Sequence, residues 1–459
     1  MSALSPIEQA KKAANCAHQH DRQGFKSTLS EMLKDQLALG VNWFPMAQFA
    51  SVLGEINLAK QALDLLLSQS PKLGHFIQAA GMYAEWGDVN NAESILNKVP
   101  EAQRDNRWYH LNGVLLSQKG ELQPAVEAFS VALQKAPLSM PTWMSLAKIQ
   151  PLSEPQLAQL KAVNPEHFDL LTQAQFYTTL VEHHEGKGEK ELADSHLEQA
   201  NQRMASMYAN NGFSMSAQLS DNLKIKQVFS SLTSQSNGQY EHYAPVFIVG
   251  LPRSGTTLLA RILTSHSDFD GGHEYALSRK ALLPQEIHQD NLDKARFADQ
   301  YLDLLAQRGL DTKLRIVDKT VDLHRYVGLL AEVFPKAKFI FIDRDEQDNK
   351  WSCYRNFFAT GVPWSYKVEE INDYFDNFYQ MTSHWKSLLG ERGISISYED
   401  LVREPQQVLE SLFEALGVEF DDSVLSFYQR KDDLVNTVSF KQVRSPLNDN
   451  SINSARRNF

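Results

Sequence analysis

The stretch VFIVGLPRSGTTLLARIL, residues 246–263, limits the possible folds of this chain more than any other feature. It begins as a run of β-branched and aromatic residues and ends as an apolar helical pattern. Between the two lies the loop Gly250–Gly255, whose glycines allow the backbone to approach a ligand. A strand, a loop of this kind and a helix in this order indicate an anion-binding unit in an α/β sheet.

Short apolar runs alternate with helical patterns through the second half of the chain. After the first strand, further runs lie at 314–318, 338–343 and 394–398, and a helical pattern follows each of them. This alternation predicts a parallel sheet with helices on both faces. Ligands of such sheets bind beyond the carboxyl ends of the strands, so residues there are the candidates for a functional site.

The loop after the first strand is expected to bind an anion, although it lacks the lysine of a nucleotide triphosphatase. Backbone amides at the start of the following helix point at a ligand from the favourable end of the helix dipole. The planar guanidinium group of Arg253 can form paired hydrogen bonds with an oxyanion. A Walker A loop has lysine where this chain has Thr256. The strand ends Asp318 and Asp343 are each followed by a cation, which favours anion binding over magnesium binding.

The first half of the chain repeats itself. Gly54, Gly87 and Gly120 follow one another at steps of 33 residues, and an alanine recurs five residues after each glycine. The period is typical of solenoids built from helical hairpins. These residues resemble tetratricopeptide repeats, and the resemblance implies a curved helical array that binds protein or mediates dimerisation.

Composition and charge narrow the possible functions. The chain has 459 residues, which predicts two or three domains, and its formal net charge of −11 argues against nucleic-acid binding. Its two cysteines lie far apart in sequence, which indicates no disulfide framework. The sequence shows no signal peptide and no apolar run as long as a membrane span, and we expect a cytoplasmic location.

The motif P-R-S-G-T-T resembles the 5′-phosphosulfate loop of sulfotransferases that use 3′-phosphoadenosine 5′-phosphosulfate (PAPS). A second element is also similar to that family: Arg344 at a strand end, with Ser352 eight residues later in a helix. In the family this pair holds the 3′-phosphate. The resemblance covers roughly 244–459 and is closest to a subgroup in which tetratricopeptide repeats precede the domain, related to tyrosylprotein sulfotransferases.

The resemblance implies a fold and a division of the chain. We expect an α plus α/β protein, in which a tetratricopeptide-like solenoid precedes a P-loop-like parallel-sheet sulfotransferase domain. The predicted parts are a helical repeat domain at 1–205, a linker at 206–243, where Asn, Ser and Gly concentrate, and the sulfotransferase domain at 244–459.

The resemblance also assigns catalytic roles. Glu274 matches the glutamate base of the tyrosylprotein branch, and His273 is its local competitor because histidine serves other sulfotransferases. An N-terminal helix cap is the structural alternative for Glu274. Lys319 matches a strand-end lysine that, with Arg253, would stabilise the leaving phosphate.

Further residues are expected to bind PAPS, the co-substrate, with no metal. Relatives usually have a tryptophan near Ala455, whereas this chain has arginines after it, so its basic tail is a candidate lid or simply a solvated tail. The predicted PAPS-binding residues are Arg253, Ser254, Gly255, Thr256, Thr257, Arg344, Ser352, Tyr398, Arg444 and Arg456.

The sequence leaves alternatives open for the identity of the acceptor and for the type of reaction. Peptide or protein tyrosine is suggested by the related branch, and carbohydrate, lipid and small hydroxyl compounds remain open. A different class is a P-loop kinase or nucleotide triphosphatase, against which the missing lysine argues. A non-enzymatic alternative is a tetratricopeptide scaffold whose second domain is inactive.

Overall fold

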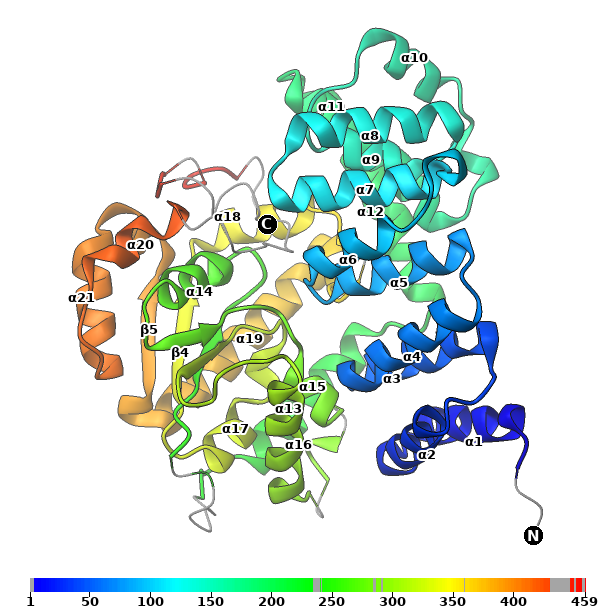
Figure 1. Ribbon diagram of the computed structural model, residues 1–459. Helices are drawn as coiled ribbons and strands as arrows, with labels where there is room; N and C mark the ends of the chain where they lie inside the picture. The colour runs from blue at the N-terminus through cyan, green and yellow to red at the C-terminus, as the bar shows by residue number, and fades with distance from the viewer. Residues whose placement is uncertain are drawn as a thin grey trace. The chain divides into compact units, whose positions relative to one another are not determined.

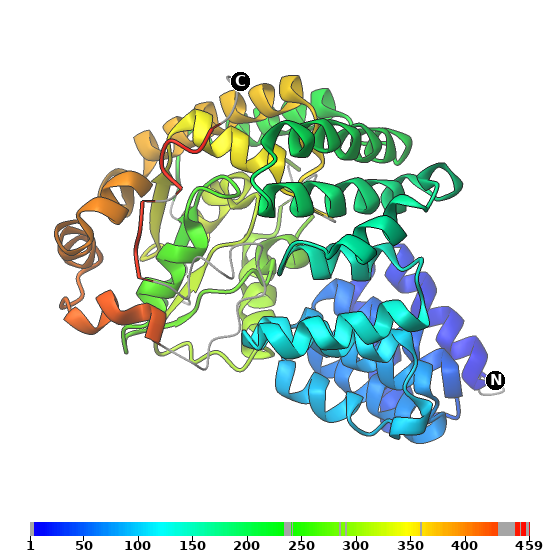
Figure 2. The same cartoon turned by 90° about the horizontal axis from the view of Figure 1, so that it is seen from above.

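A computed structural model describes residues 4–233, 240, 242–283, 286–289, 292–358, 360–429, 446–449, 451–455 and 459 (Figures 1 and 2). The chain divides into two compact units. Unit 1 is Met1–Thr142 with Gln300–Gly309, and unit 2 is Trp143–Asp299 with Leu310–Phe459. Helices α9 (Met140–Ala147) and α16 (Lys294–Ala306) are each divided between them.

Unit 1 consists of helices that pack in consecutive pairs. Each pair is a hairpin, as in α7 and α8, where the buried Ala125 and Ala132 let the two helices approach. The helices are α1 (Pro6–His18), α2 (Arg22–Lys34), α3 (Trp43–Leu53), α4 (Ile56–Gln69), α5 (Leu73–Glu85), α6 (Val89–Leu96), α7 (Asn106–Lys119) and α8 (Leu122–Lys135), with 3₁₀ turns η1 (Gly40–Asn42) and η2 (Glu101–Gln103).

The equally spaced glycines turn the chain between paired helices. Gly54, Gly87 and Gly120 have φ angles of 85°, 80° and 84°, the left-handed region that favours glycine. Each lies directly between the two helices of a hairpin. The 33-residue period is therefore a period of structure, while protein binding or dimerisation by these repeats stays a prediction.

Polar and charged side chains attach residues 300–309 to the helices of unit 1. Glu55 is almost fully buried, and its carboxylate pairs with Arg22 at 2.8 Å and with Lys26 at 3.2 Å. Lys26 also contacts Asp303 at 2.8 Å, and Gln307 donates to Glu55 at 2.9 Å. Two cations thus compensate the buried carboxylate.

Unit 2 combines a parallel sheet with helices from both halves of the sequence. Its helices are α10 (Glu154–Lys161), α11 (Leu170–Gly186), α12 (Lys190–Asn210), α13 (Met215–Val228), α14 (Thr256–Thr264), α15 (Leu277–Ala281), α17 (Val327–Val333), α18 (Glu346–Arg355), α19 (Val368–Leu389), α20 (Tyr398–Arg403) and α21 (Pro405–Leu416), with 3₁₀ turns η3 (Pro165–His167), η5 (Leu323–Arg325), η6 (Pro363–Tyr366), η7 (Gly390–Arg392) and η8 (Asp422–Gln429). The predicted fold, helical repeats followed by a parallel α/β sheet, is confirmed. The proposed domain boundaries by residue number stay a prediction.

The sheet has five parallel strands in the order β2-β3-β1-β4-β5. Its central strand β1 is buried throughout, and alternate residues point to opposite faces. Ile248 joins a core with α14 and α21, whereas Phe247 stacks on Phe334 and Phe339. The strands are β1 (Val246–Val249), β2 (Phe269–Gly271), β3 (Arg315–Asp318), β4 (Lys338–Asp343) and β5 (Gly393–Ser397).

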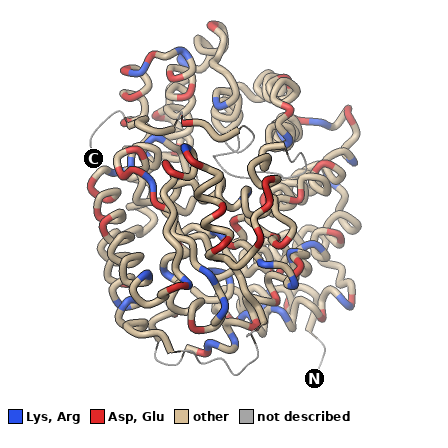
Figure 3. The backbone as a smooth tube through the Cα atoms, turned by 90° about the vertical axis from the view of Figure 1, so that its left-hand side faces the viewer, with Lys and Arg blue, Asp and Glu red and all other residues tan. Residues whose placement is uncertain are grey.

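Two further observations concern the distribution of charged residues and the character of the helices. Figure 3 shows Lys and Arg interspersed with Asp and Glu along the tube in that view, so basic residues are not gathered into one region of it. Among the residues that the structure describes, no helix combines the length and the apolar character that crossing a membrane requires.

Candidate functional site

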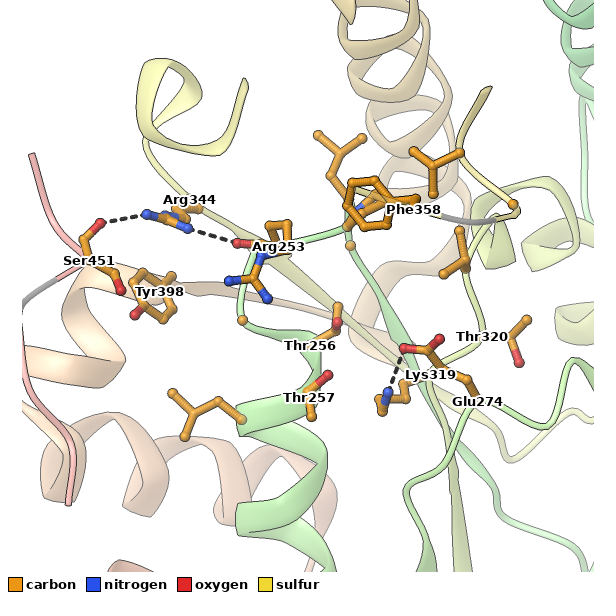
Figure 4. Close-up of a pocket in the computed structure, with 18 of the residues that line it drawn as sticks. Arg253, Thr256, Thr257, Glu274, Lys319, Thr320, Arg344, Phe358, Tyr398 and Ser451 are labelled. Carbon is orange, nitrogen blue, oxygen red and sulfur yellow. Dashed lines mark hydrogen bonds and ion pairs between the residues drawn. The ribbon is translucent and has the colours of Figure 1, made fainter. Parts of the chain in front are cut away.

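A pocket of about 620 Å³ opens at the carboxyl edge of the sheet in unit 2 (Figure 4). All five strands are parallel, so their carboxyl ends share this edge, and a residue that follows each strand lines the pocket. These residues are Arg253 after β1, Glu274 after β2, Lys319 after β3, Arg344 after β4 and Tyr398 after β5.

The loop after β1 has an unusual backbone. Arg253 has a φ of 68°, in the left-handed region that non-glycine residues rarely adopt, and Gly255 has a φ of 101°. Helix α14 begins at Thr256, directly after Gly255. A Cβ at Gly255 would lie 2.6 Å from Cδ2 of Tyr398, so only glycine fits without displacing that ring.

Helix α18 supports the loop from behind. Asn349 and Cys353 both donate to the carbonyl oxygen of Pro252, at 2.7 and 3.2 Å, and Arg253 Nε donates to Ser352 Oγ at 3.2 Å. These residues of α18 are three and four positions apart, so they share one helix face. Burial raises the pKa of the Cys353 thiol to about 12, which makes it a structural donor rather than a nucleophile.

Arg344 connects the end of β4 to the loop. It is 8% exposed, its Nη1 donates to the carbonyl oxygen of Arg253 at 2.9 Å, and its guanidinium lies 5.1 Å from the Tyr398 ring centre. Burial lowers the pKa of Arg253, although an arginine keeps its charge in proteins. Both guanidinium groups therefore place positive charge beside the start of α14.

Two buried donor atoms, one in the loop and one just after β4, have no hydrogen-bond partner among the described residues: Oγ of Ser254 and Nε of Arg344. Buried polar groups are nearly always paired, so unpaired donors beside a pocket indicate room for a ligand. Together with the amides that open α14, they form a set of donors suited to phosphate or sulfate oxygens.

Glu274 and Lys319 form an ion pair on the other side of Thr256 and Thr257 (Figure 4). Lys319 Nζ lies 2.7 Å from Glu274 Oε1, and the side chains are 2% and 40% exposed, respectively. Thr320 holds the two loops together, because its Oγ1 accepts from the Ala276 amide at 3.2 Å and donates to Asp318 at 2.7 Å.

The structure brings most of the predicted site residues to one pocket. Ser254 and Ser352 are not among the residues that line it: Ser254 is buried under the loop, and Ser352 contacts Arg253 from α18. Arg444 and Arg456 lie outside the described residues. The residues that line the pocket are Arg253, Gly255, Thr256, Thr257, Glu274, Lys319, Arg344 and Tyr398.

Sequence reasoning missed several pocket residues. Met144 and Lys148 come from α9 and the residue after it, and Phe357 and Phe358 follow α18. Burial lowers the pKa of Lys148, and its ammonium lies 5.9 Å from the Phe357 ring centre. No motif marks these positions, and only folding brings them to the pocket.

The site combines a cationic anion cradle with a carboxylate–lysine pair. Among the described residues, no group of three or more His, Cys, Asp or Glu side chains is placed to hold a metal ion. The class defined by fold and site is a parallel α/β protein with a phosphate-type loop and a charged pair suited to proton transfer.

Comparisons with known proteins show what this part of the chain is similar to. The model of the Sulfotransferase family matches residues 245–422, so this region is similar to that family. An "Uncharacterized protein" of Aquifex aeolicus (strain VF5) is 31% identical over 234 residues, which cover 46% of this chain and 30% of that protein. Protein-tyrosine sulfotransferase 2 of Gallus gallus is 26% identical over 198 residues, which cover 39% of this chain and 53% of the relative.

The matched segments thus span between about a third and about half of these two relatives' length. Among solved structures, the sulfotransferase domain from the Synechococcus PCC 7002 olefin synthase matches with a TM-score of 0.37 and 20% identity. The match covers 50% of this chain and 92% of that one.

Proposed function

We propose that this chain transfers a sulfuryl group from PAPS to an acceptor hydroxyl, with peptide tyrosine as the acceptor. One observation carries the proposal: the ends of five parallel strands place two arginines and a Glu–Lys pair around one pocket. The match to the sulfotransferase family supports it.

The donor set fits an anionic co-substrate. The amides at the start of α14 and the hydroxyls of Thr256 and Thr257 would hold the phosphosulfate end, with Arg253 beside them. Arg344, whose Nε is buried and has no described partner, would hold the 3′-phosphate. Ser352 would act through Arg253, because its hydroxyl already accepts from that side chain.

Transfer needs positioning and charge stabilisation rather than a covalent enzyme intermediate. When bound, PAPS supplies a sulfuryl group whose bond to the phosphate oxygen breaks as the bond to the acceptor oxygen forms. Glu274 takes the proton from the acceptor hydroxyl, since its carboxylate lies in the pocket and is 40% exposed. Lys319 orients that carboxylate and stabilises charge on the departing phosphate.

Peptide tyrosine is proposed because the likeness to protein-tyrosine sulfotransferases and the pocket wall agree. Phe357, Phe358 and Val362 give the pocket an aromatic and aliphatic side beside the polar one. An aromatic hydroxyl can pack there while its oxygen faces Glu274.

Calorimetric titration with 3′-phosphoadenosine 5′-phosphate (PAP), the product nucleotide, tests the donor site. We expect micromolar binding that needs no magnesium. Each of Arg253→Ala and Arg344→Ala should weaken it about 100-fold, because charge-assisted hydrogen bonds contribute about 1.5–3 kcal/mol each. Arg403→Ala, at an exposed position of α20 outside the pocket, is the matched control.

Three kinds of outcome would overturn all or part of the proposal. No micromolar binding of PAP, or unchanged affinity in both arginine variants, removes the donor site. Magnesium-dependent binding of ATP instead of PAP would indicate a kinase or nucleotide triphosphatase. Labelled sulfate in other hydroxyl compounds but not in tyrosine peptides would exclude peptide tyrosine as the acceptor and leave the proposed sulfuryl transfer in place.

A further inference from the structure

A C-terminal segment, residues 451–455, lies across the first turn of α18. The backbone amides of Ser454 and Ala455 both donate to Asp348 Oδ1, at 2.6 and 2.8 Å. The carbonyl oxygen of Ser451 accepts from Arg344 Nη2. At the chain end, the Phe459 amide donates to Gln347 at 2.8 Å. One helix terminus thus attaches this segment at several points.

Asp348 is the strongest of these attachments. Its side chain is buried, and the residue is 1% exposed. It lies in the first turn of its helix, where the helix dipole favours a carboxylate. Two amides on one carboxylate oxygen are charge-assisted hydrogen bonds, which are about twice as strong as neutral ones. A carboxylate buried here without those amides would be costly, so the segment and Asp348 stabilise each other.

The same segment forms part of the pocket wall. Ser451 lines the pocket, as do Pro446, Leu447 and Asn448. Ser451 also accepts from Arg344, the side chain whose Nε is buried without a described partner. The place of the segment therefore determines both the wall of the pocket and the orientation of this guanidinium.

We propose that Asp348 is a positioning residue for the nucleotide. It holds residues 451–455 across Arg344, so that the guanidinium is fixed toward the pocket and a bound phosphate is enclosed. It acts through the segment and touches no reacting atom. The inference rests on the proposed function, because the ligand it names is the phosphate of a phosphorylated adenosine nucleotide.

Dissociation of PAP from the full chain tests this role. In Asp348→Ala we expect PAP to dissociate about ten-fold faster or more, with a smaller change in the association rate. Asp348→Asn keeps an oxygen that accepts both amides and should recover most of the parental rate. Asp345→Ala is the matched control, because Asp345 caps the same helix by accepting from the Asp348 amide and, among the described residues, makes no hydrogen bond to the segment.

Hydrogen exchange in the absence of nucleotide gives a second readout. The amides of Ser454 and Ala455 should be protected in the parent and in Asp348→Asn, and should exchange freely in Asp348→Ala. If Asp348→Ala does not fold, the rates and exchange of Asp348→Asn and Asp345→Ala decide instead.

Four results would overturn the inference. They are retained protection in a folded Asp348→Ala, parental PAP dissociation despite lost protection, equal acceleration in Asp345→Ala, and PAP release from Asp348→Asn as fast as from Asp348→Ala. A parent that binds no PAP rejects the proposed function and the nucleotide part of the inference. Exchange then still decides whether Asp348 anchors the segment.

Discussion

Two walls of the same pocket are built in different ways. The loop wall consists of residues 250–253 and 255–257 with Arg344 and Tyr398. The far wall consists of Lys148, Glu274 and Phe357–Phe358. Hydrogen bonds from α18 and from β4 fix the loop wall. The far wall comes from three segments that are distant in sequence, and its carboxylate is partly exposed. We therefore expect the loop wall to bind the nucleotide in one fixed geometry and the far wall to adapt to the acceptor.

The far wall should carry the largest single effect on turnover. In Glu274→Gln we expect kcat to fall by about 10²–10⁴-fold, because general bases contribute that much, while PAP affinity stays unchanged. Sulfate transfer at saturating PAPS, with PAP titration in parallel, measures both. Glu369→Gln, at an exposed position of α19, is the control. Equal turnover in Glu274→Gln and the parent would mean that Glu274 is not the general base. Only the loop wall would then keep its proposed role.

The backbone of the loop wall offers a second test. Gly255→Ala forces a side chain into a φ of 101° and against Tyr398, and should cost about 1–3 kcal/mol of stability and weaken PAP binding about ten-fold. Gly417→Ala is matched, because its φ of 67° is also left-handed but nothing lies within 4 Å of the added Cβ. Thermal unfolding and PAP titration compare the two. Equal losses of PAP affinity would mean that backbone strain alone, not contact with Tyr398, limits the loop.

The smallest expected effect sharpens the comparison most. Lys148→Met should change the acceptor KM by a few-fold and leave PAP affinity unchanged, because Lys148 lines the far wall beside Phe357. A series of tyrosine peptides that differ in charge measures the change. A loss of PAP affinity in this variant would contradict the division into two walls.

The loop wall could be predicted from sequence because its information is local. A strand, two glycines and an arginine specify a turn whose amides meet at a helix start, and parallel strands bring their ends together. Lys148 and Phe358 carry no such signal. Their place depends on how helices far away in sequence pack, which no short motif records.

One prediction from helical periodicity alone is wrong. It predicts that the adjacent His183 and His184 are solvated residues at a helix end, but they are only 3% and 4% exposed. His183 Nδ1 accepts from the Leu152 amide at 3.1 Å, and His184 contacts Glu189 and stacks on His196. Contacts beyond the helix cover both faces, and helical periodicity alone could not reveal them.

Helix α18 has a consequence for which ligands can fit. Arg344 lies just before its start, and two turns later its side chains contact the Pro252 carbonyl oxygen and the Arg253 side chain. The helix therefore sets the distance between Arg344 and Arg253, and with it the distance between two anionic groups that these side chains could bind. Inserting one residue into α18 before Ser352 would rotate the rest of the helix by about 100° and break its contacts with the loop. The pocket would then select ligands by the distance between their anionic groups as well as by their charge.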